Sequence, residues 1–172
     1  MKKELILILV LVSSMVIVNA QTRGTDEAAI RQALGSFSTS WNKGDFSDMS
    51  NYMTADSHWI NVVGMHWKSL KEVEYAHQVF IKSAFKDVER KEKSVDIRFI
   101  TNDVAIAYWL TYVGVFYSPD GVDRGNNKQG DRDNLATVVL VRQKDKWLIS
   151  SVQNSDVVAQ AAASDPVLRM NK

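Results

Sequence analysis

The chain has 172 residues, of which 24% are charged and 45% are hydrophobic. Its 21 lysines and arginines almost balance 20 acidic residues, so it lacks the basic field that holds nucleic acid or a polyphosphate. The absence of cysteine excludes disulfides and thiolate zinc sites. Three histidines without a His-x-His pair give no metal-binding pattern, and no loop motif for a nucleotide is present. We therefore expect no nucleic-acid partner, metal or cofactor.

The N-terminus predicts an export signal. Lys2 and Lys3 precede an almost unbroken apolar run from Leu5 to Val18, and the small residues up to Ala20 fit a cleavage site. The run is about 14 residues long, whereas roughly 20 are needed to cross a bilayer. A signal peptide is therefore favoured over a membrane anchor, and we expect a periplasmic or secreted protein that has no membrane attachment after cleavage.

The rest of the chain has the size of one domain. Removing a signal peptide at residues 1–20 from the 172 residues leaves 152, enough for a core without disulfide or metal staples. We place the domain at residues 21–158. The tail at residues 159–172 contains a proline and few large apolar residues, so we expect it to be loosely ordered.

Helical signals gather in the first half of the domain. Thr25 is a candidate N-cap, and Gly44 fits the stop of the helix that would follow. A short second helix is indicated by Phe46, Met49 and Tyr52. Ser69 and Glu72 form a capping box at the start of a further helix, which carries His77 on its apolar side. The apolar stripe of the first helix consists of Ile30, Leu34, Phe37 and Trp41.

Strand signals dominate the second half. One strand is expected at residues 57–63, before the capping box, and the others lie at residues 95–100, 104–117, 134–142 and 147–153. The mixed-sign run at residues 86–93 is typical of a solvated strand or loop face, and residues 118–133 indicate a long, mobile hairpin loop. This order predicts an α+β fold, in which a curved antiparallel sheet wraps around the N-terminal helices.

Several segments agree in order and spacing with one family. They are Trp-Asn-Lys-Gly-Asp (41–45), Tyr-Met-Thr-Ala-Asp (52–56), Asn-Val-Val-Gly-Met-His-Trp-Lys (61–68), Ala-His (76–77), Lys-Trp-Leu-Ile (146–149) and Gln-Asn-Ser-Asp (153–156). With these segments the chain resembles the nuclear-transport-factor-2-like superfamily, also called cystatin-like or SnoaL-like, and within it the SgcJ/EcaC-type group. Ser69 departs from the glycine that this group often has at that position.

The resemblance implies a cone-shaped fold that encloses an apolar pocket and often dimerises through its sheet. Relatives in the superfamily include isomerases, dehydratases and cyclases, as well as binding and assembly domains. Some descriptions label the narrower group an oxidoreductase, but the sequence shows no flavin or nucleotide motif that would support this label.

Two residues are candidate catalytic groups. His77 lies on the apolar stripe of its helix, where a neutral imidazole could exchange a proton, although a structural hydrogen bond would also explain it. Asp56 precedes a strand and could act as a base if burial raises its pKa, although a turn carboxylate is equally ordinary. The resemblance raises the weight of the catalytic interpretation for His77, and implies that an acidic residue near Asp56 can line the cone.

The candidate ligand-binding residues are polar or aromatic side chains on the strands. Asn61 is expected in the middle of a strand, where a polar amide needs a partner, and Asn154 near the end of the last strand raises the same question. Buried structural amides are the alternative. His66 beside the first strand and the aromatic residues Trp59 and Tyr112 complete the set.

The sequence leaves three functions open. The first is binding of a small apolar molecule with cofactor-independent acid–base chemistry of the isomerase, dehydratase or cyclase type. The second is a binding module without chemistry, and the third is a dimeric assembly domain. We expect a homodimer in each case. Fold alone does not choose among them.

Overall fold

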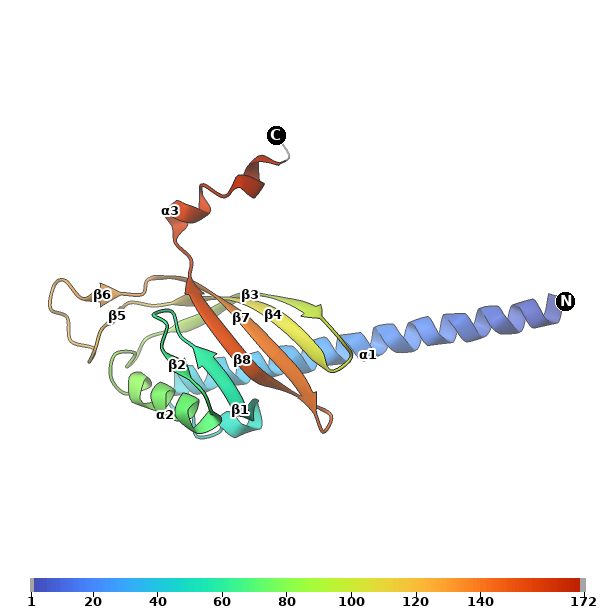
Figure 1. Cartoon of the computed structure of the whole chain (residues 1–172), viewed down its shortest axis with the longest axis horizontal. Coiled ribbons are helices and arrows are strands. Elements are labelled where there is room, and N and C mark those ends of the chain that lie inside the picture. The colour runs from blue at the N-terminus through green and yellow to red at the C-terminus, as the bar shows by residue number, and fades with distance from the viewer. Residues whose placement is uncertain (1, 171–172) are drawn as a thin grey trace.

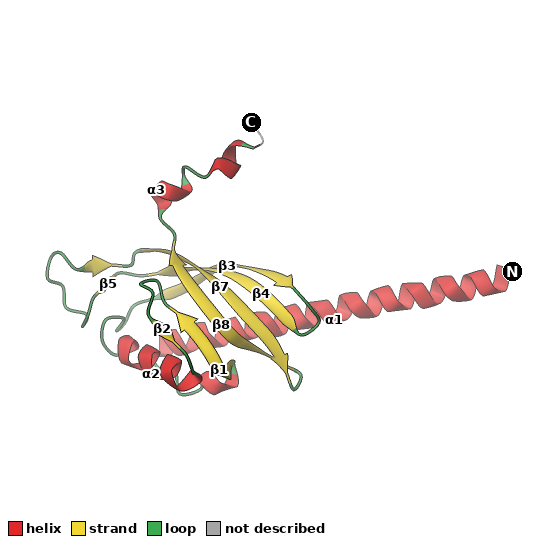
Figure 2. Cartoon of the chain, viewed as in Figure 1, coloured by secondary structure: helices red, strands yellow, loops and turns green. Residues whose placement is uncertain are grey.

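Two helices lie against one side of a curved sheet in the computed structural model (Figures 1 and 2). The structure describes residues 2–170, with side chains from residue 23 onward except at residue 162. The helical elements are α1 (Lys2–Lys43), η1 (Met49–Asn51), α2 (Leu70–Ile81), α3 (Ala159–Ala162) and η2 (Pro166–Arg169). The strands are β1 (Met53–Ile60), β2 (His66–Trp67), β3 (Arg90–Phe99), β4 (Val104–Val113), β5 (Phe116–Tyr117), β6 (Lys128–Gln129), β7 (Arg132–Gln143) and β8 (Lys146–Asp156).

Helix α1 is one continuous helix up to Lys43. It runs through Thr25, so the predicted N-cap there is wrong: Gly24 costs a helix only about 1 kcal/mol, and nothing else nearby breaks it. The predicted stop is confirmed. Gly44 has φ +70, and the N–H groups of Gly44 and Asp45 return to the carbonyls of Trp41 and Ser40, both at 3.0 Å.

The predicted signal peptide falls on this first stretch of α1, where side chains lie outside the described residues. No helix in the described part of the chain combines the length and the apolar character needed to cross a membrane.

The main sheet has six strands in the order β2-β1-β8-β7-β4-β3. All neighbours are antiparallel except β1 and β8, which are parallel, so the expectation of a purely antiparallel sheet is wrong for this pair. No tight turn joins β1 to β8, and nothing local therefore sets their relative direction. The α+β class and the curved sheet over helices are confirmed (Figure 1).

The core fills the space between α1 and the concave face of the sheet. Alternate residues of the central strands point inward, among them Ala107, Trp109 and Val138, each at 0% exposure. They meet the predicted apolar stripe of α1, where Leu34 is at 0% and Phe37 at 1% exposure. The small alanines opposite large helix side chains let the helix approach the sheet closely.

Strand β1 ends at Ile60, earlier than predicted. Asn61 is therefore in a turn and not in the middle of a strand, and its Oδ1 accepts hydrogen bonds from the N–H groups of Val63 (3.1 Å) and Met65 (2.9 Å). Such an asparagine turn satisfies the side-chain oxygen locally, which explains why an apolar stretch does not continue the strand.

The predicted strand at residues 104–117 is divided at Gly114. Beyond it, β5 pairs with β6 in a separate two-stranded ribbon, so the predicted hairpin at residues 118–133 is confirmed, and the segment contributes β6 to this ribbon. Gly130, with φ +73, closes this ribbon: a Cβ there would collide with the Gly114 carbonyl. The absence of a side chain at Gly130 allows the two segments to approach closely.

Helix α2 begins at the predicted capping box. The Ser69 Oγ accepts the N–H of Glu72 (3.3 Å), and the Glu72 carboxylate accepts the N–H of Lys68 (2.7 Å). The helix buries Val73, His77 and Ile81, which confirms that His77 lies on its apolar side. The C-terminal tail leads away from the domain as two short helical turns with exposed side chains (Figure 1).

Candidate ligand pocket

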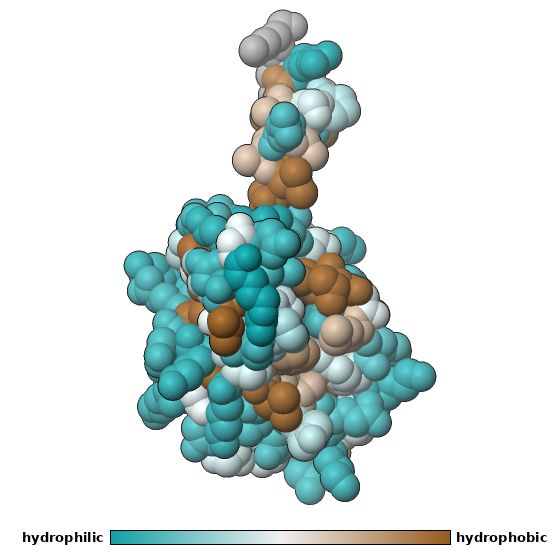
Figure 3. Space-filling model, turned by 90° about the vertical axis from the view of Figure 1, so that its left-hand side faces the viewer, coloured by the Kyte–Doolittle hydropathy of each residue, from teal (hydrophilic) through white to brown (hydrophobic). Residues whose placement is uncertain are grey.

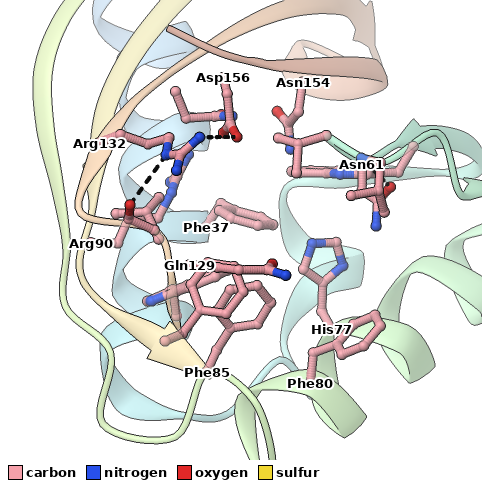
Figure 4. Close-up of a pocket in the computed structure, with 18 of the residues that line it drawn as sticks. Phe37, Asn61, His77, Phe80, Phe85, Arg90, Gln129, Arg132, Asn154 and Asp156 are labelled. Atoms are coloured by element: carbon pink, nitrogen blue, oxygen red, sulfur yellow. Dashed lines mark hydrogen bonds and ion pairs between the residues drawn. The ribbon is translucent and has the colours of Figure 1, made fainter. Parts of the chain in front are cut away.

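A cavity of about 330 Å³ lies where α1, α2, the β1–β2 turn and the β5–β6 ribbon meet the concave face of the sheet. Its lining is mainly apolar and contains seven aromatic rings (Figure 4). Figure 3 views the end of the molecule that carries α2 and the ribbon, where brown apolar patches lie between hydrophilic side chains. The aromatic residues of the lining are Phe37, Trp41, Trp59, Trp67, Phe80, Phe85 and Phe116.

His77 is placed in this aromatic wall by α2. Its side chain is 6% exposed, and its Nδ1 lies 2.8 Å from the carbonyl oxygen of Val73, one helical turn earlier. Because a carbonyl can only accept, Nδ1 carries the proton and Nε2 keeps a lone pair. Four rings surround the imidazole with centroid distances of 4.6–5.2 Å, and they belong to Phe37, Phe46, Trp59 and Trp67.

The electrostatics keep His77 neutral. Burial lowers its pKa to about 4, and the positive charge of Arg90 acts in the same direction, whereas the hydrogen bond to Val73 opposes them. At neutral pH the ring is a hydrogen-bond acceptor through Nε2. It is also a weak base, because a general base works best with a pKa near the working pH.

Arg90 is a charged pocket residue that the sequence did not reveal, as are Arg132 and Asp156. It begins β3 within the mixed-sign run at residues 86–93, which was expected to be a solvated face, yet it is 6% exposed. Its guanidinium lies 3.9 Å from the ring centroid of Trp109, and its Nη1 donates to the Ser38 Oγ at 3.1 Å. The neighbours in sequence are polar and exposed, so no periodicity marked it.

The backbone of Arg90 is fixed to the end of α1. Its N–H donates to the Asn42 Oδ1, and the Asn42 Nδ2 donates to its carbonyl, both at 3.2 Å. Burial lowers the pKa of Arg90 to about 9, and the nearby Glu92 carboxylate opposes this. The guanidinium therefore remains cationic at neutral pH.

Further polar groups of the lining lie at the end of β8 and at the start of the neighbouring β7. Asn154 has a buried Oδ1 without a hydrogen-bond partner in the described structure. Asp156 also lines the pocket and forms an ion pair with Arg132 at 3.4 Å. Figure 4 shows Arg132, Asp156 and Asn154 at one side of the pocket and His77 at another. The described residues contain no group of three or more side chains that could hold a metal ion.

The structure brings together four of the seven predicted site residues: His77, Trp59, Asn61 and Asn154 all line the pocket. It places the other three elsewhere. Asp56 is exposed on β1, because Ser57 and Trp59 take the inward positions of that strand. The carboxylate that lines the pocket is that of Asp156.

Alternation also removes His66 and Tyr112 from the lining. His66 is exposed, and its Nε2 lies 3.0 Å from Nδ1 of His58, while the adjacent Trp67 faces inward. Tyr112 is next to the buried Thr111 on β4, and its hydroxyl donates to the Asp131 Oδ1 at 2.9 Å. Neither residue is on the pocket side of its strand.

The comparison with protein families decides the relationship. The model of the SnoaL-like domain matches residues 30–160. The chain belongs to the SnoaL-like domain family. This confirms the predicted superfamily, while the SgcJ/EcaC-type group stays a prediction. A search of curated proteins gave no match.

Solved structures of SnoaL-like and cystatin-like folds resemble this one. An uncharacterised protein with a cystatin-like fold from Caulobacter vibrioides is 28% identical, with a TM-score of 0.78, and the match covers 84% of this chain and 98% of that one. A provisionally named dehydratase of the NTF2-like family from Streptomyces avermitilis is 20% identical, with a TM-score of 0.62 over 78% and 98% of the two chains. A provisionally named scytalone dehydratase from Novosphingobium aromaticivorans is 8% identical, with a TM-score of 0.63 over 81% and 89%. The last two likenesses show the fold alone.

Proposed function

We propose that this SnoaL-like protein binds a small, largely apolar molecule in its pocket. The observation that carries the proposal is the cavity of about 330 Å³ walled by aromatic rings, with a neutral imidazole among them. Pockets of this size and composition, with a few convergent polar groups, are typical of small-molecule sites. A flat ligand would lie among the rings of Trp59, Trp67 and Phe80.

Both the apolar and the polar residues of the lining are needed to account for the binding free energy. Burying about 200 Å² of apolar ligand surface is worth about 5 kcal/mol. Micromolar affinity needs about 8 kcal/mol, so polar contacts must supply the difference. The lone pair of His77 and the unpartnered Oδ1 of Asn154 both accept hydrogen bonds. A ligand with a hydroxyl or N–H group would satisfy them.

Ligand capture tests this proposal directly. The purified protein is incubated with a metabolite extract, and the retained small molecules are identified by mass spectrometry. Val113→Phe, which places a larger side chain in the pocket lining, should lose the retained molecule. Val122→Phe, at an exposed position with 53% exposure, is the matched control and should keep it. Equal retention by the two variants would place binding outside the pocket.

Acid–base catalysis without a cofactor is the second candidate. The tautomer fixed by Val73 favours it, because Nε2 of His77 faces no structural partner in the described chain and can accept a proton from a bound substrate. The isomerase, dehydratase or cyclase class is compatible with this single group and with the provisional names of two fold relatives. The asparagine amides of Asn61 and Asn154 would orient the substrate.

The two candidates differ in their response to His77→Gln. A catalyst should lose turnover of the captured molecule and keep binding, whereas a binding module shows no turnover in either form. A third candidate, an assembly domain with an unused pocket, would retain no molecule at all. In that case only the oligomeric state should respond to mutation.

We also propose a homodimer formed through the outer face of the sheet. Residues of β4 and β7 that point away from the core carry apolar side chains there, and register pairs Leu110 with Leu135 and Ile106 with Val139. Leu135 is 40% and Tyr108 36% exposed. Light scattering should give twice the chain mass for the wild type, and Leu135→Glu should halve it. A monomeric wild type would contradict the proposal.

Export is the remaining proposal, supported by the basic start and short apolar run of residues 1–20. Expression in a bacterium with the full leader should yield a periplasmic or secreted protein that begins at Gln21, as read from its N-terminal peptide by mass spectrometry. An uncut cytoplasmic product would overturn this assignment.

A further inference from the structure

We propose that the ligand of this pocket carries one carboxylate group and that Arg90 holds it. The inference rests on the proposed binding function and adds the chemical class of the ligand: a small aromatic or cyclic carboxylate. The observation behind it is a guanidinium that is almost fully buried in an apolar lining and has no carboxylate partner.

Burial without a partner is unusual for a permanent cation. Arg90 is 6% exposed, and within the described residues it makes no ion pair. The nearby Glu92 uses its Oε2 to accept the Trp109 Nε1–H at 2.9 Å. A buried charge without an ion-pair partner costs several kcal/mol, and the nearby Glu92 carboxylate offsets only part of this cost. A bound anion would supply the missing compensation.

The guanidinium is held in place but keeps most of its donors. The ring of Trp109 lies 3.9 Å from its central carbon, and that of Phe37 lies 5.1 Å away. A guanidinium has five N–H donors. One of them, on Nη1, donates to the Ser38 Oγ, and this is the only hydrogen bond of the guanidinium within the described chain. The remaining donors suit a carboxylate, which accepts two parallel bonds from a guanidinium.

The charges around the pocket select a monoanion. The other charged groups of the lining are Arg132 and Asp156, which pair with each other at 3.4 Å and contribute no net charge. His77 is neutral, so Arg90 is the cation of the described lining that makes no ion pair, and Glu92, which is not a lining residue, offsets its charge only in part. A dianion such as a phosphate monoester would leave one negative charge uncompensated in an apolar cavity. The aromatic lining accounts for the rest of the ligand.

Matched pairs of probes test the inference by isothermal titration calorimetry at pH 7.5. The pairs are benzoate with benzamide, 2-naphthoate with 2-naphthamide, and cyclohexanecarboxylate with cyclohexanecarboxamide. For the pair that binds best, the acid should bind at least tenfold more tightly than the amide. Equal affinities, or a tighter amide, would overturn the carboxylate assignment and leave the proposed binding function standing. If no acid of any pair binds, the carboxylate assignment is refuted, and metabolite capture by the wild-type protein decides separately whether the binding function stands.

Two variants then test whether Arg90 is the residue that binds the carboxylate. Arg90→Met keeps a long apolar side chain and should reduce the acid-to-amide preference to less than twofold. Arg98→Met, an exposed arginine on the same strand, is the control and should keep the preference. A preference that survives Arg90→Met in the folded protein would refute the role of Arg90. Because the wild-type comparison needs no variant, the inference is testable even if Arg90→Met does not fold.

An independent readout comes from His77. The charge of Arg90 lowers the pKa of this histidine, and a bound carboxylate offsets that charge. Titration followed by NMR should therefore show a higher His77 pKa with the bound acid than with the bound amide. The same pKa in both complexes would contradict the placement of the carboxylate beside Arg90.

Discussion

The pH dependence of stability should report the protonation of His77, and with it how strongly the pocket wall excludes water from this ring. The ring is 6% exposed, and its only donor is already committed to the Val73 carbonyl. Burial is the main reason that its pKa lies near 4 and not near the ordinary 6.5. As the pH falls, the unfolded chain therefore takes up a proton before the folded one does, and stability decreases.

The size of this effect follows from the two pKa values. The contribution of the neutral ring is fully present above pH 6.5 and is lost as the pH falls towards 4. At about 1.4 kcal/mol per pH unit, the total loss is about 3 kcal/mol. About 2 kcal/mol of it should already be lost at pH 5, before most carboxylates titrate.

The assay needs a background in which His77 is the only histidine. His58→Gln and His66→Gln remove the other two of the three histidines, both of which are exposed. Urea unfolding followed by tryptophan fluorescence then gives the free energy of unfolding at pH 7.5, 6.5, 5.5 and 5.0. His77→Phe in the same background keeps a ring and removes the titration. The two proteins should diverge by about 2 kcal/mol between pH 7.5 and pH 5. Parallel pH profiles would refute the buried neutral imidazole.

Three further substitutions probe the packing around the pocket. Phe37→Ala should lower the free energy of unfolding by about 3–5 kcal/mol in urea melts, because this ring is 1% exposed; a loss below about 1 kcal/mol would show a loosely packed core. Gly130→Ala should lower the melting temperature clearly more than Gly125→Ala does. Both glycines have positive φ, but only a Cβ at position 130 would collide with backbone atoms. Equal melting temperatures of the two variants would show that the close contact in the ribbon does not contribute to stability. Asp26→Ala removes a buried carboxylate that pairs with the partly exposed Arg142 and accepts the Trp147 Nε1–H, and it should lower the free energy of unfolding by about 2 kcal/mol in chemical denaturation; an unchanged midpoint would contradict that role.

The sequence predicted the elements whose signals are local. The apolar stripe of α1, the glycine stop at Gly44 and the capping box at Ser69 all depend on contacts within a few residues. The inward position of His77 followed from the same helical period. These features were confirmed because the 3.6-residue period of a helix places apolar residues of the sequence on one side of it.

The strand limits were less predictable. The chain turns after β1 because the Asn61 side chain accepts hydrogen bonds from the N–H groups of Val63 and Met65. Gly114 separates β4 from β5 within the apolar run at residues 104–117. In each case a single turn residue overrides a long apolar pattern. Strand alternation leaves open which face of the sheet lines the cavity, and the tertiary structure decided that Asp56 and Tyr112 both face away from the pocket.

The sequence by itself determined the superfamily, the C-terminal end of α1, and the start and inward face of α2, because these rest on short-range periodicity and on the order of a few segments. Only the tertiary structure decided which polar groups share one cavity. Arg90 is separated from His77 by thirteen positions and sits in a charged run, yet the bend of the sheet and the docking of α1 bring both to one aromatic pocket. Burial is a property of the whole packed chain, so no local pattern could distinguish this arginine from its solvated neighbours.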